Sequence, residues 1–246
     1  MGSAHEATHP PLDVLKPMAE DVWIVDSGPL NAMGLRIPVR MAVVRLRSGE
    51  TWLHSPTRFS AELKAENEEL GPIRHLVAPN VAHWQFLKDW QAAVPEAETW
   101  AVPGLRRRPA ARSRLRSDHD LGPEAPAAWR EEIEQVLVRG GFGVSEAAFL
   151  HLPSRTLLLT DLVQNMEAEK LGPLERRILG AAGSVAPNGR APLHLRLAMR
   201  ANRSEAQAAA RRLVEMRPER VIFAHGLWFD RDAPAALARS LRWLTE

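Results

Sequence analysis

Three short apolar runs, each followed by a polar residue, constrain the fold of this chain more than any other feature. They cover residues 73–78, 156–160 and 221–224, and each has the length of a strand. Strands come first along the chain, then mixed strands and helices, and amphipathic helices lie near the C-terminus. This order predicts an α/β fold of the αββα type, in which two packed sheets are flanked by helices.

Turn residues locate two hairpins. Residues 40–47 and 51–54 flank a Ser-Gly-Glu turn, and residues 145–151 precede 156–161 across a Leu-Pro-Ser-Arg turn. Apolar spacing and stop signals predict helices over residues 56–70, 82–93, 127–138, 174–182, 204–216 and 233–244, with Ser204 as a capping residue. Residues 105–126 lack an apolar period and predict a long surface loop. We expect one domain over residues 21–246 after an N-terminal lead of residues 1–20.

The composition excludes several kinds of site. The chain has no cysteine, which excludes disulfides, thiolate metal sites and a cysteine nucleophile. No stretch approaches the roughly 20 apolar residues of a membrane span, and the N-terminus has no apolar core of signal-peptide length. We therefore expect a cytoplasmic protein without a membrane partner. A Gly-x-Ser-x-Gly motif is also absent, so nothing supports a serine hydrolase.

Six arginines between residues 106 and 116 could bind phosphate or RNA. The segment has no interleaved aromatic residues, and Asp118 and Asp120 follow it directly. The formal net charge of the whole chain is only +2, which gives little steering toward polyanions. These observations favour a solvated loop and argue against a nucleic-acid partner.

The residues that follow the three apolar runs are candidates for a site. They are His83, Asp161 and His225. Strand ends with loops are where sites are assembled, because the sheet fixes the position of each group. Two imidazoles and a carboxylate form a common ligand set for Zn, Fe or Mn. The alternative is that Asp161 caps a turn and that the two histidines are hydrogen-bonded structural residues.

Four stretches of the chain resemble a bacterial family of unknown function. They are RLRSGETWLHSP (residues 45–56), HLVAPNVAH (75–83), FLHLPSRTLLLTDL (149–162) and RVIFAHG (220–226). That family is similar to a divergent branch of the metallo-β-lactamase-fold superfamily. The resemblance extends from about residue 21 to the C-terminus, and it implies a metallo-β-lactamase-like domain over residues 21–246.

The resemblance also implies that most of the usual metal ligands are missing. The superfamily signature His-x-His-x-Asp-His ends on His83 in this chain, whereas its first three ligand positions fall on Ala78, Asn80 and Ala82. Asp161 matches the carboxylate that bridges two metals, and His225 matches the closing histidine of a His-Gly pair. An intermediate histidine, expected near residues 143–145, has no counterpart.

What remains is the ligand set of the second metal subsite. This implies either one divalent metal ion (Zn, Fe or Mn) held by His83, Asp161 and His225, or no metal. A two-metal hydrolytic centre is not expected. The absence of the aspartate at Ala82 removes a ligand and the expected general base, which argues against ordinary hydrolysis.

Two further residues are candidates for catalytic roles. His54 follows a short strand, and it either faces the pocket as a substitute ligand or proton shuttle or orients the Ser55-Pro56 turn. Asn80 either donates to a substrate oxygen or hydrogen-bonds the backbone of its own loop. Glu146 would oppose Asp161 in the second hairpin, whereas His151 would lie too far along the strand and is interpreted as structural.

Three functions remain open from the sequence. The first is a mononuclear metal-dependent hydrolase that acts on an unidentified small molecule. The second is a non-catalytic binding or assembly module that has lost the metal site. The third is RNA or phosphate binding through the segment from Arg106 to Arg116. The sequence indicates neither the substrate nor the oligomeric state.

Overall fold

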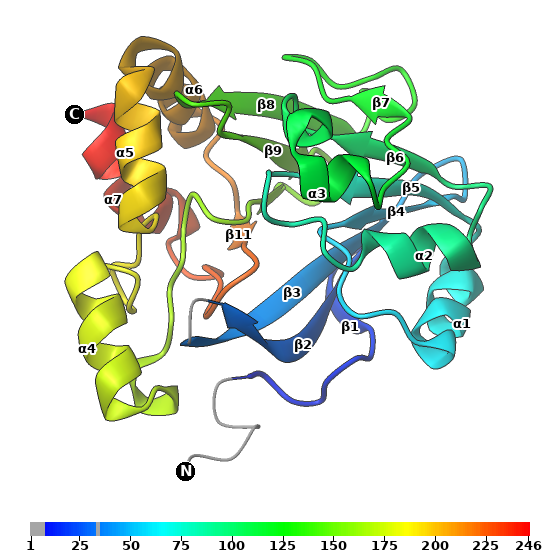
Figure 1. Cartoon of the computed structure of the whole chain (residues 1–246), viewed down its shortest axis with the longest axis horizontal. Helices are drawn as coiled ribbons and strands as arrows, with labels where there is room; N and C mark the ends of the chain where they lie inside the picture. Colours follow the sequence, from blue (N-terminus) through cyan, green and yellow to red (C-terminus); the bar gives the residue numbers. More distant parts are fainter. Residues whose placement is uncertain (1–7, 33–34) are drawn as a thin grey trace.

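Two β-sheets pack against each other between two groups of helices in the computed structural model, which describes residues 8–32 and 35–246 (Figure 1). The seven-stranded sheet has the order β1 to β7, formed by Lys16–Ala19, Val22–Ala32, Leu35–Arg45, Thr51–His54, Ile73–Ala78, Glu98–Ala101 and His119–Asp120. The four-stranded sheet has the order β11-β10-β9-β8, with β8 Ile133–Arg139, β9 Ser145–His151, β10 Thr156–Leu158 and β11 Arg220–Ile222. The predicted αββα architecture is confirmed.

The helices cover the outer faces of the two sheets. They are α1 Ala61–Leu70, α2 Leu87–Ala93, α3 Pro109–Arg112, α4 Pro173–Ala182, α5 Leu193–Ala201, α6 Arg203–Glu215 and α7 Ala233–Thr245, with short 3-10 turns at Leu105–Arg107 and Ala168–Lys170. Figure 1 shows α1, α2 and α3 on one side of the sheets and α4 to α7 on the other. Within the described residues, no helix combines the length and apolar character needed to cross a membrane.

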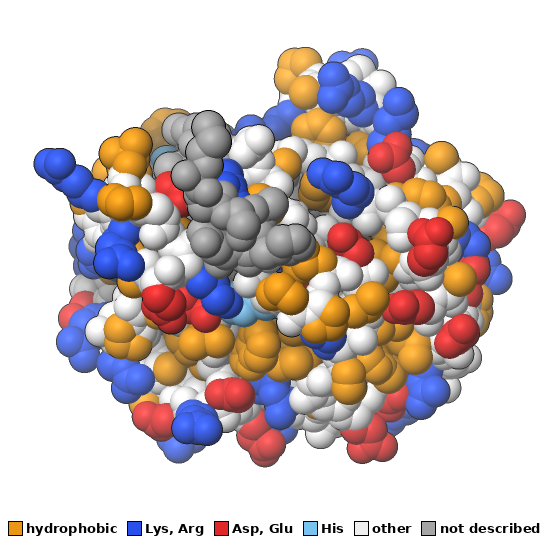
Figure 2. Space-filling model, turned by 90° about the horizontal axis from the view of Figure 1, so that it is seen from below, with side chains coloured by type: hydrophobic (Ala, Val, Ile, Leu, Met, Phe, Trp, Pro, Cys, Tyr) orange, Lys and Arg blue, Asp and Glu red, His pale blue; other side chains and the backbone are white. Residues whose placement is uncertain are grey.

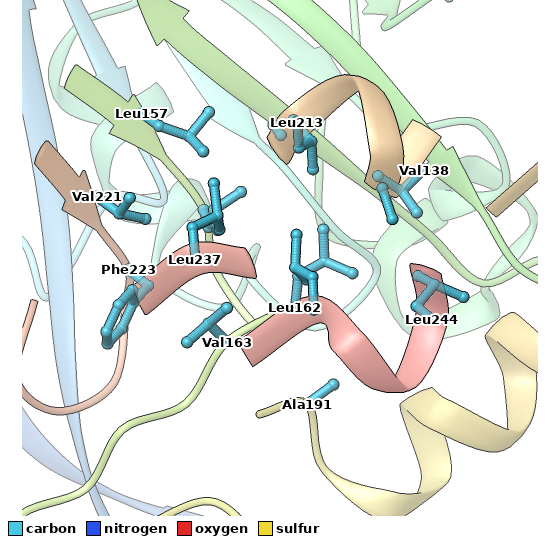
Figure 3. Close-up of a cluster of buried hydrophobic side chains, with 14 of the residues drawn as sticks. Val138, Leu157, Leu162, Val163, Ala191, Leu213, Val221, Phe223, Leu237 and Leu244 are labelled. Carbon is cyan, nitrogen blue, oxygen red and sulfur yellow. The ribbon is translucent and has the colours of Figure 1, made fainter. Parts of the chain in front are cut away.

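Buried apolar side chains fill the spaces between these layers. Trp52, Trp129 and Phe149 belong to the cluster between the two sheets. A second cluster lies between the four-stranded sheet and α5 to α7 (Figure 3). Leu162 and Val163, which directly follow Asp161, belong to this second cluster and are completely buried. Their burial fixes the backbone next to Asp161, because moving it would expose both side chains to water.

Strand pairing confirms both predicted hairpins. β3 and β4 are antiparallel with Ala42 opposite His54, and β9 and β10 are antiparallel with His151 opposite Thr156. The strand predicted over residues 73–78 is β5, which runs parallel to β4. The segment predicted as a loop, residues 105–126, contains only a 3-10 turn, one short helix and a two-residue strand.

The predicted helix over residues 127–138 is wrong. Residues 133–139 form β8, which pairs with β9 along its whole length. Ile133, Val136 and Val138 are buried there, and β-branched residues fit a pleated sheet better than a helix. The sequence analysis also missed α5, and α6 begins after Asn202 and not at a Ser204 cap.

The boundary between an N-terminal lead and one domain stays a prediction. Residues 1–7 of that lead lie outside the described residues. Within its described part, Lys16–Ala19 forms β1 and pairs with β2 in the seven-stranded sheet.

Candidate metal centre

The three predicted ligands lie at one edge of the molecule, where the two sheets meet. His83 stands on the loop between β5 and α2, so it extends from the seven-stranded sheet. Asp161 and His225 follow β10 and β11 of the four-stranded sheet. These two strands are parallel neighbours, so the loops that follow them leave the sheet at the same end.

The side chains of His83, Asp161 and His225 converge on a common point. One ligand atom from each residue lies within 4.8 Å of the other two. The two carboxylate oxygens of Asp161 contact different rings, with Oδ2 3.3 Å from His83 Nε2 and Oδ1 3.4 Å from His225 Nε2. The two Nε2 atoms are 3.2 Å apart. The structure therefore brings together the three residues that the sequence analysis selected as metal ligands.

The hydrogen bonds of the two imidazole rings indicate which nitrogen faces the centre as a ligand. His225 Nδ1 lies 2.7 Å from the carbonyl oxygen of Pro38, which can only accept, so Nδ1 carries the proton and Nε2 presents its lone pair. His83 Nδ1 lies 2.7 Å from the hydroxyl of Ser55. A lone pair on His225 Nε2 at 3.2 Å from His83 Nε2 requires either a hydrogen on His83 Nε2 or a metal ion between the two atoms. A ring held in this way by its other nitrogen is typical of metal-binding histidines.

Neighbouring charges and hydrogen bonds keep the Asp161 carboxylate ionised. Burial alone would raise the pKa of Asp161, but the charge of His83 and hydrogen bonds from both histidines hold it well below its usual range. Burial is the largest influence and lowers the pKa of His83, but the charge of Asp161, its hydrogen bond and the charge of Glu146 together raise it above the ordinary value. Asp161 is therefore ionised at neutral pH, as a metal ligand must be.

Asn80 positions both Asp161 and His83. Its side-chain oxygen accepts from the backbone N–H groups of Ala82 and His83, at 2.8 and 2.9 Å. Since two N–H donors identify that atom as oxygen, the other amide atom is the nitrogen, which donates to Asp161 Oδ2 at 2.7 Å and to the Thr160 hydroxyl at 2.9 Å. Asn80 thus bonds its own loop, which is one of the two predicted alternatives, and it is only 4% exposed.

Glu146 and Gln164 complete the support of Asp161. The Glu146 carboxylate, which is completely buried, accepts from the backbone N–H groups of Thr160, Asp161 and Leu162. Burial and the charge of Asp161 raise the pKa of Glu146 despite these hydrogen bonds. Gln164 Nε2 donates to Asp161 Oδ1 at 2.8 Å. The register that places Glu146 opposite Asp161 was predictable, but no sequence pattern pointed to Gln164.

Arg40 and Gly226 shape the loop that carries His225. Arg40 Nη1 donates to the carbonyl oxygens of Phe223 and Gly226, both at 2.8 Å, on either side of His225. Gly226 has φ of +88°, and a Cβ there would lie 2.2 Å from the carbonyl oxygen of Asn165. Only glycine fits this position, because a side chain would meet both backbone strain and a steric clash.

His54 lies in the core between the sheets and is not among the residues that line the site's cavity. Its ring stacks on Trp52 and meets the edge of Phe149, with ring centroids 5.7 and 5.5 Å away. It is 2% exposed, and burial together with the charge of His83 lowers its pKa to about 3. The imidazole is therefore neutral at physiological pH. The next residue, Ser55, holds His83, and sequence reasoning did not select it.

A cavity of about 400 Å³ opens beside the three ligands. Apolar side chains dominate its wall and include Leu30, Ile37, Trp84, Phe86, Ile178 and Leu193. They come from the β2–β3 hairpin, from the loop before α2, and from α4 and α5. Figure 2 shows the molecule from below. Hydrophobic side chains gather near the middle of the visible face, and charged side chains lie mostly around them. Among the described lining residues, Asp161 is the one carboxylate and His194 the one ionisable group besides the candidate ligands.

Comparisons with known proteins agree with this geometry at the level of the fold. A metallo-beta-lactamase from Pontibacter korlensis is 15% identical over 94% of this chain and 97% of its own length, with a TM-score of 0.64. A metallo-beta-lactamase from Hirschia baltica is 14% identical over 91% and 95%, with a TM-score of 0.61. The mono-zinc form of the metallo-beta-lactamase FIM-1 from Pseudomonas aeruginosa is 15% identical over 93% and 94%, with a TM-score of 0.60.

A family comparison gives a second result. A family model described as "Domain of unknown function (DUF4336)" matches residues 19–177. No curated protein matches the chain in sequence. The family match and the structural neighbours together confirm the resemblance to a divergent branch of the metallo-β-lactamase fold.

Proposed function

The chain belongs to the family described as a domain of unknown function (DUF4336), and we propose that in this member His83, Asp161 and His225 hold one divalent metal ion. The observation that carries the proposal is the pair of Nε2 atoms that face each other at 3.2 Å beside an ionised carboxylate. Two nitrogens and one oxygen are a ligand set that suits Zn, Fe and Mn. The mono-zinc form of FIM-1 supports a single ion in this fold.

We propose hydrolase-like chemistry on a small molecule that carries a carbonyl group and an apolar body. A divalent ion at this centre would supply Lewis-acid polarisation of that carbonyl. The apolar wall of the cavity would bind the rest of the substrate and exclude water around it. Ala82 offers no carboxylate, and Asp161 is held by Asn80 and Gln164. His194, at the start of α5, is the lining residue left to transfer a proton.

We assign no substrate contact to His54 or Asn80. The side chain of Asn80 is used up by bonds to its own loop, to Thr160 and to Asp161. His54 is enclosed by aromatic rings. In this proposal Asn80 is a positioning residue for the metal ligands, and His54 is part of the core.

Metal analysis of the full chain purified without an affinity tag tests the metal site. We expect about one equivalent of Zn, Fe or Mn per chain, and loss of that metal in His225→Ala and Asp161→Asn. His119→Ala is the matched control, because His119 contacts Trp100 and Glu98 far from the three ligands in the sheet order. A folded parent chain that holds no metal and takes up none from added Zn, Fe(II) or Mn would refute the proposal.

A non-catalytic binding module is the second candidate, and the closed hydrogen-bond network favours it. His83 is held by Ser55, His225 by Pro38, and Asp161 by Asn80 and Gln164, so the site is assembled from protein groups alone. This candidate predicts that His83→Ala and His225→Ala leave the binding of an apolar ligand unchanged. Loss of that binding together with the metal would favour the hydrolase-like function.

A further inference from the structure

A second and larger hollow lies on the other side of the segment of residues 182–194, and arginines surround it. Its volume is about 770 Å³, compared with about 400 Å³ for the cavity at the candidate metal centre. Gly183, Asn188 and Arg190 contribute to this hollow, whereas Ala182, Ser184 and Pro192 line the metal-site cavity. Adjacent residues of one segment therefore form walls of two different cavities.

Five guanidinium groups line the large hollow, and one acidic residue lies among them. The arginines are Arg190 on the loop before α5, Arg200 at the end of α5, Arg203 at the start of α6, and Arg239 and Arg242 on α7; the acidic residue is Glu246. Such an excess of one sign is notable in a chain whose formal net charge is only +2. Like charges around one concave space repel each other, and a bound anion would relieve this repulsion.

The existing partners of these arginines leave most of the charge unpaired. Arg239 reaches Asp232 only at 3.8 Å and Arg242 reaches Glu246 at 3.4 Å, and both pairs are solvent-exposed and therefore weak. Arg203 donates to the main-chain oxygen of Glu246. Within the described part of the chain, neither Arg190 nor Arg200 has a carboxylate within ion-pair distance.

Arg190 is held in place by the local backbone. Its N–H donates to the carbonyl oxygen of Gly183, and Gly183 has φ of +76° at the end of α4. A Cβ at Gly183 would lie 2.1 Å from Arg190 Nε, so a side chain there would displace this guanidinium. Nε itself is buried without a hydrogen-bond partner. A buried charged donor without a hydrogen-bond partner is costly to the folded state.

The positive charges of these arginines also affect the pKa of the neighbouring Arg196. Burial lowers its pKa, and the charges of Arg190 and Arg200 lower it further. Trp243 also lines the hollow, and its indole Nε1 is buried without a partner. The hollow thus combines several guanidinium groups and an aromatic ring.

We propose that this arginine-lined hollow binds a small organic di- or triphosphate. Guanidinium forks match phosphate oxygens in geometry and charge, and several are needed for a polyphosphate. A volume of about 770 Å³ is far larger than one phosphate ion needs and lies in the usual range of small-ligand sites. The arginines surround one concave space and do not follow a stripe with interleaved aromatic residues, which favours a compact ligand over a nucleic-acid strand.

The segment that the sequence analysis considered for phosphate binding differs from this hollow. Arg106 pairs with Asp120 at 3.1 Å and Arg116 with Asp118 at 3.1 Å, so neighbouring carboxylates already neutralise part of that charge. The hollow beside it measures only about 240 Å³. The strongest phosphate-binding surface is therefore near α5 to α7 and not between residues 106 and 116.

Titration calorimetry on the full chain with inorganic pyrophosphate, ADP and adenosine tests the proposal. We expect one pyrophosphate or ADP to bind per chain, no binding of adenosine, and affinity that falls at least about tenfold between about 50 and 200 mM salt. Arg200→Ala and Arg239→Ala should each weaken pyrophosphate binding about tenfold, because each removes a charge-assisted contact.

Two matched controls locate the binding. Arg130→Ala removes the same charge from an exposed arginine on the turn before β8 and should leave the affinity unchanged. His225→Ala should also leave it unchanged, which separates this site from the candidate metal centre. The proposal is overturned if pyrophosphate and ADP fail to bind, if either control loses as much affinity as the hollow variants, or if single-stranded RNA binds while pyrophosphate does not.

Discussion

Arg40 and Asp26 form a buried ion pair, with Nη2 2.6 Å from Oδ1 and side-chain exposures of 2% and 3%. The same guanidinium bonds the two carbonyl groups that flank His225. Lys16 also contacts Asp26, at 2.5 Å from Oδ2. One buried cation therefore links β3 to the loop after β11, which comes from the other sheet.

Replacement of Arg40 by methionine should destabilise the protein by about 3 kcal/mol, because it leaves two carbonyl groups and part of the Asp26 charge unsatisfied. Urea unfolding measures this change. The control is Arg45→Met on the same strand, where the Arg45–Asp21 pair is 47% and 33% exposed, and the expected loss is below about 1 kcal/mol. Equal losses in the two variants would show that Arg40 has no special role.

Gly226→Ala should cost several times more stability than Gly49→Ala. Both glycines have positive φ, +88° and +83°, so both variants carry the backbone strain of about 1 kcal/mol. A Cβ at Gly49 meets nothing within 4 Å, whereas one at Gly226 clashes with Asn165. Thermal or urea unfolding of the two variants isolates the cost of the clash. Similar values for both would contradict the close packing of Gly226.

In metal-free protein, Asn80→Asp should lower the free energy of unfolding more than Asn80→Ala does. The alanine variant loses the bonds to Asp161 and to the His83 loop, which costs about 1–3 kcal/mol. The aspartate variant replaces a donor by a second negative charge next to the Asp161 carboxylate, which adds repulsion. Urea unfolding after removal of metal by a chelator gives the order. An aspartate variant as stable as the parent would contradict the positioning role.

His54 should make the folded state sensitive to mild acid. Its folded pKa of about 3 lies below the ordinary value of 6.5, so between these values the unfolded chain binds a proton that the folded chain does not. The free energy of unfolding therefore falls as the pH decreases below 6.5, by about 2 kcal/mol at about pH 5.

His54→Leu removes this contribution, so its stability should decrease less between pH 7 and about pH 5 than that of the parent. Urea unfolding at a series of pH values measures the difference. His194→Leu, at an exposed histidine, should keep the pH dependence of the parent. Parallel curves for His54→Leu and the parent would show that His54 is accessible to protons in the folded state.

Much of the fold was predictable because its strands have strong local patterns. β5 and the two hairpins follow from apolar runs bounded by turn residues. β8 was not predictable in this way, because its Glu, Gln and Arg residues suit a helix and only pairing with β9 selects the strand. α5 was missed because the Pro-rich and Gly-rich segment before it indicates a loop.

The candidate site was predictable where strand ends determine position. His83, Asp161 and His225 each follow a recognisable strand, and the sheet order then brings them together. Ser55, Gln164, Arg40 and the Pro38 carbonyl were missed, because their roles depend on contacts between segments far apart in the sequence. His54 is the last residue of β4, but its side chain points into the aromatic core, and the alternation of side chains along the strand decides that direction.

The origin of the three ligands in two different sheets has a mechanical consequence. An ion held by His83 on one side and by Asp161 and His225 on the other would act as a cross-link between the two layers, much as a disulfide joins distant segments. Removal of the ion would then weaken the contact between the two sheets, while the hydrogen bonds between strands within each sheet stay intact. Because such a cross-link stabilises the fold, these three side chains could be retained even in a descendant that no longer catalyses a reaction.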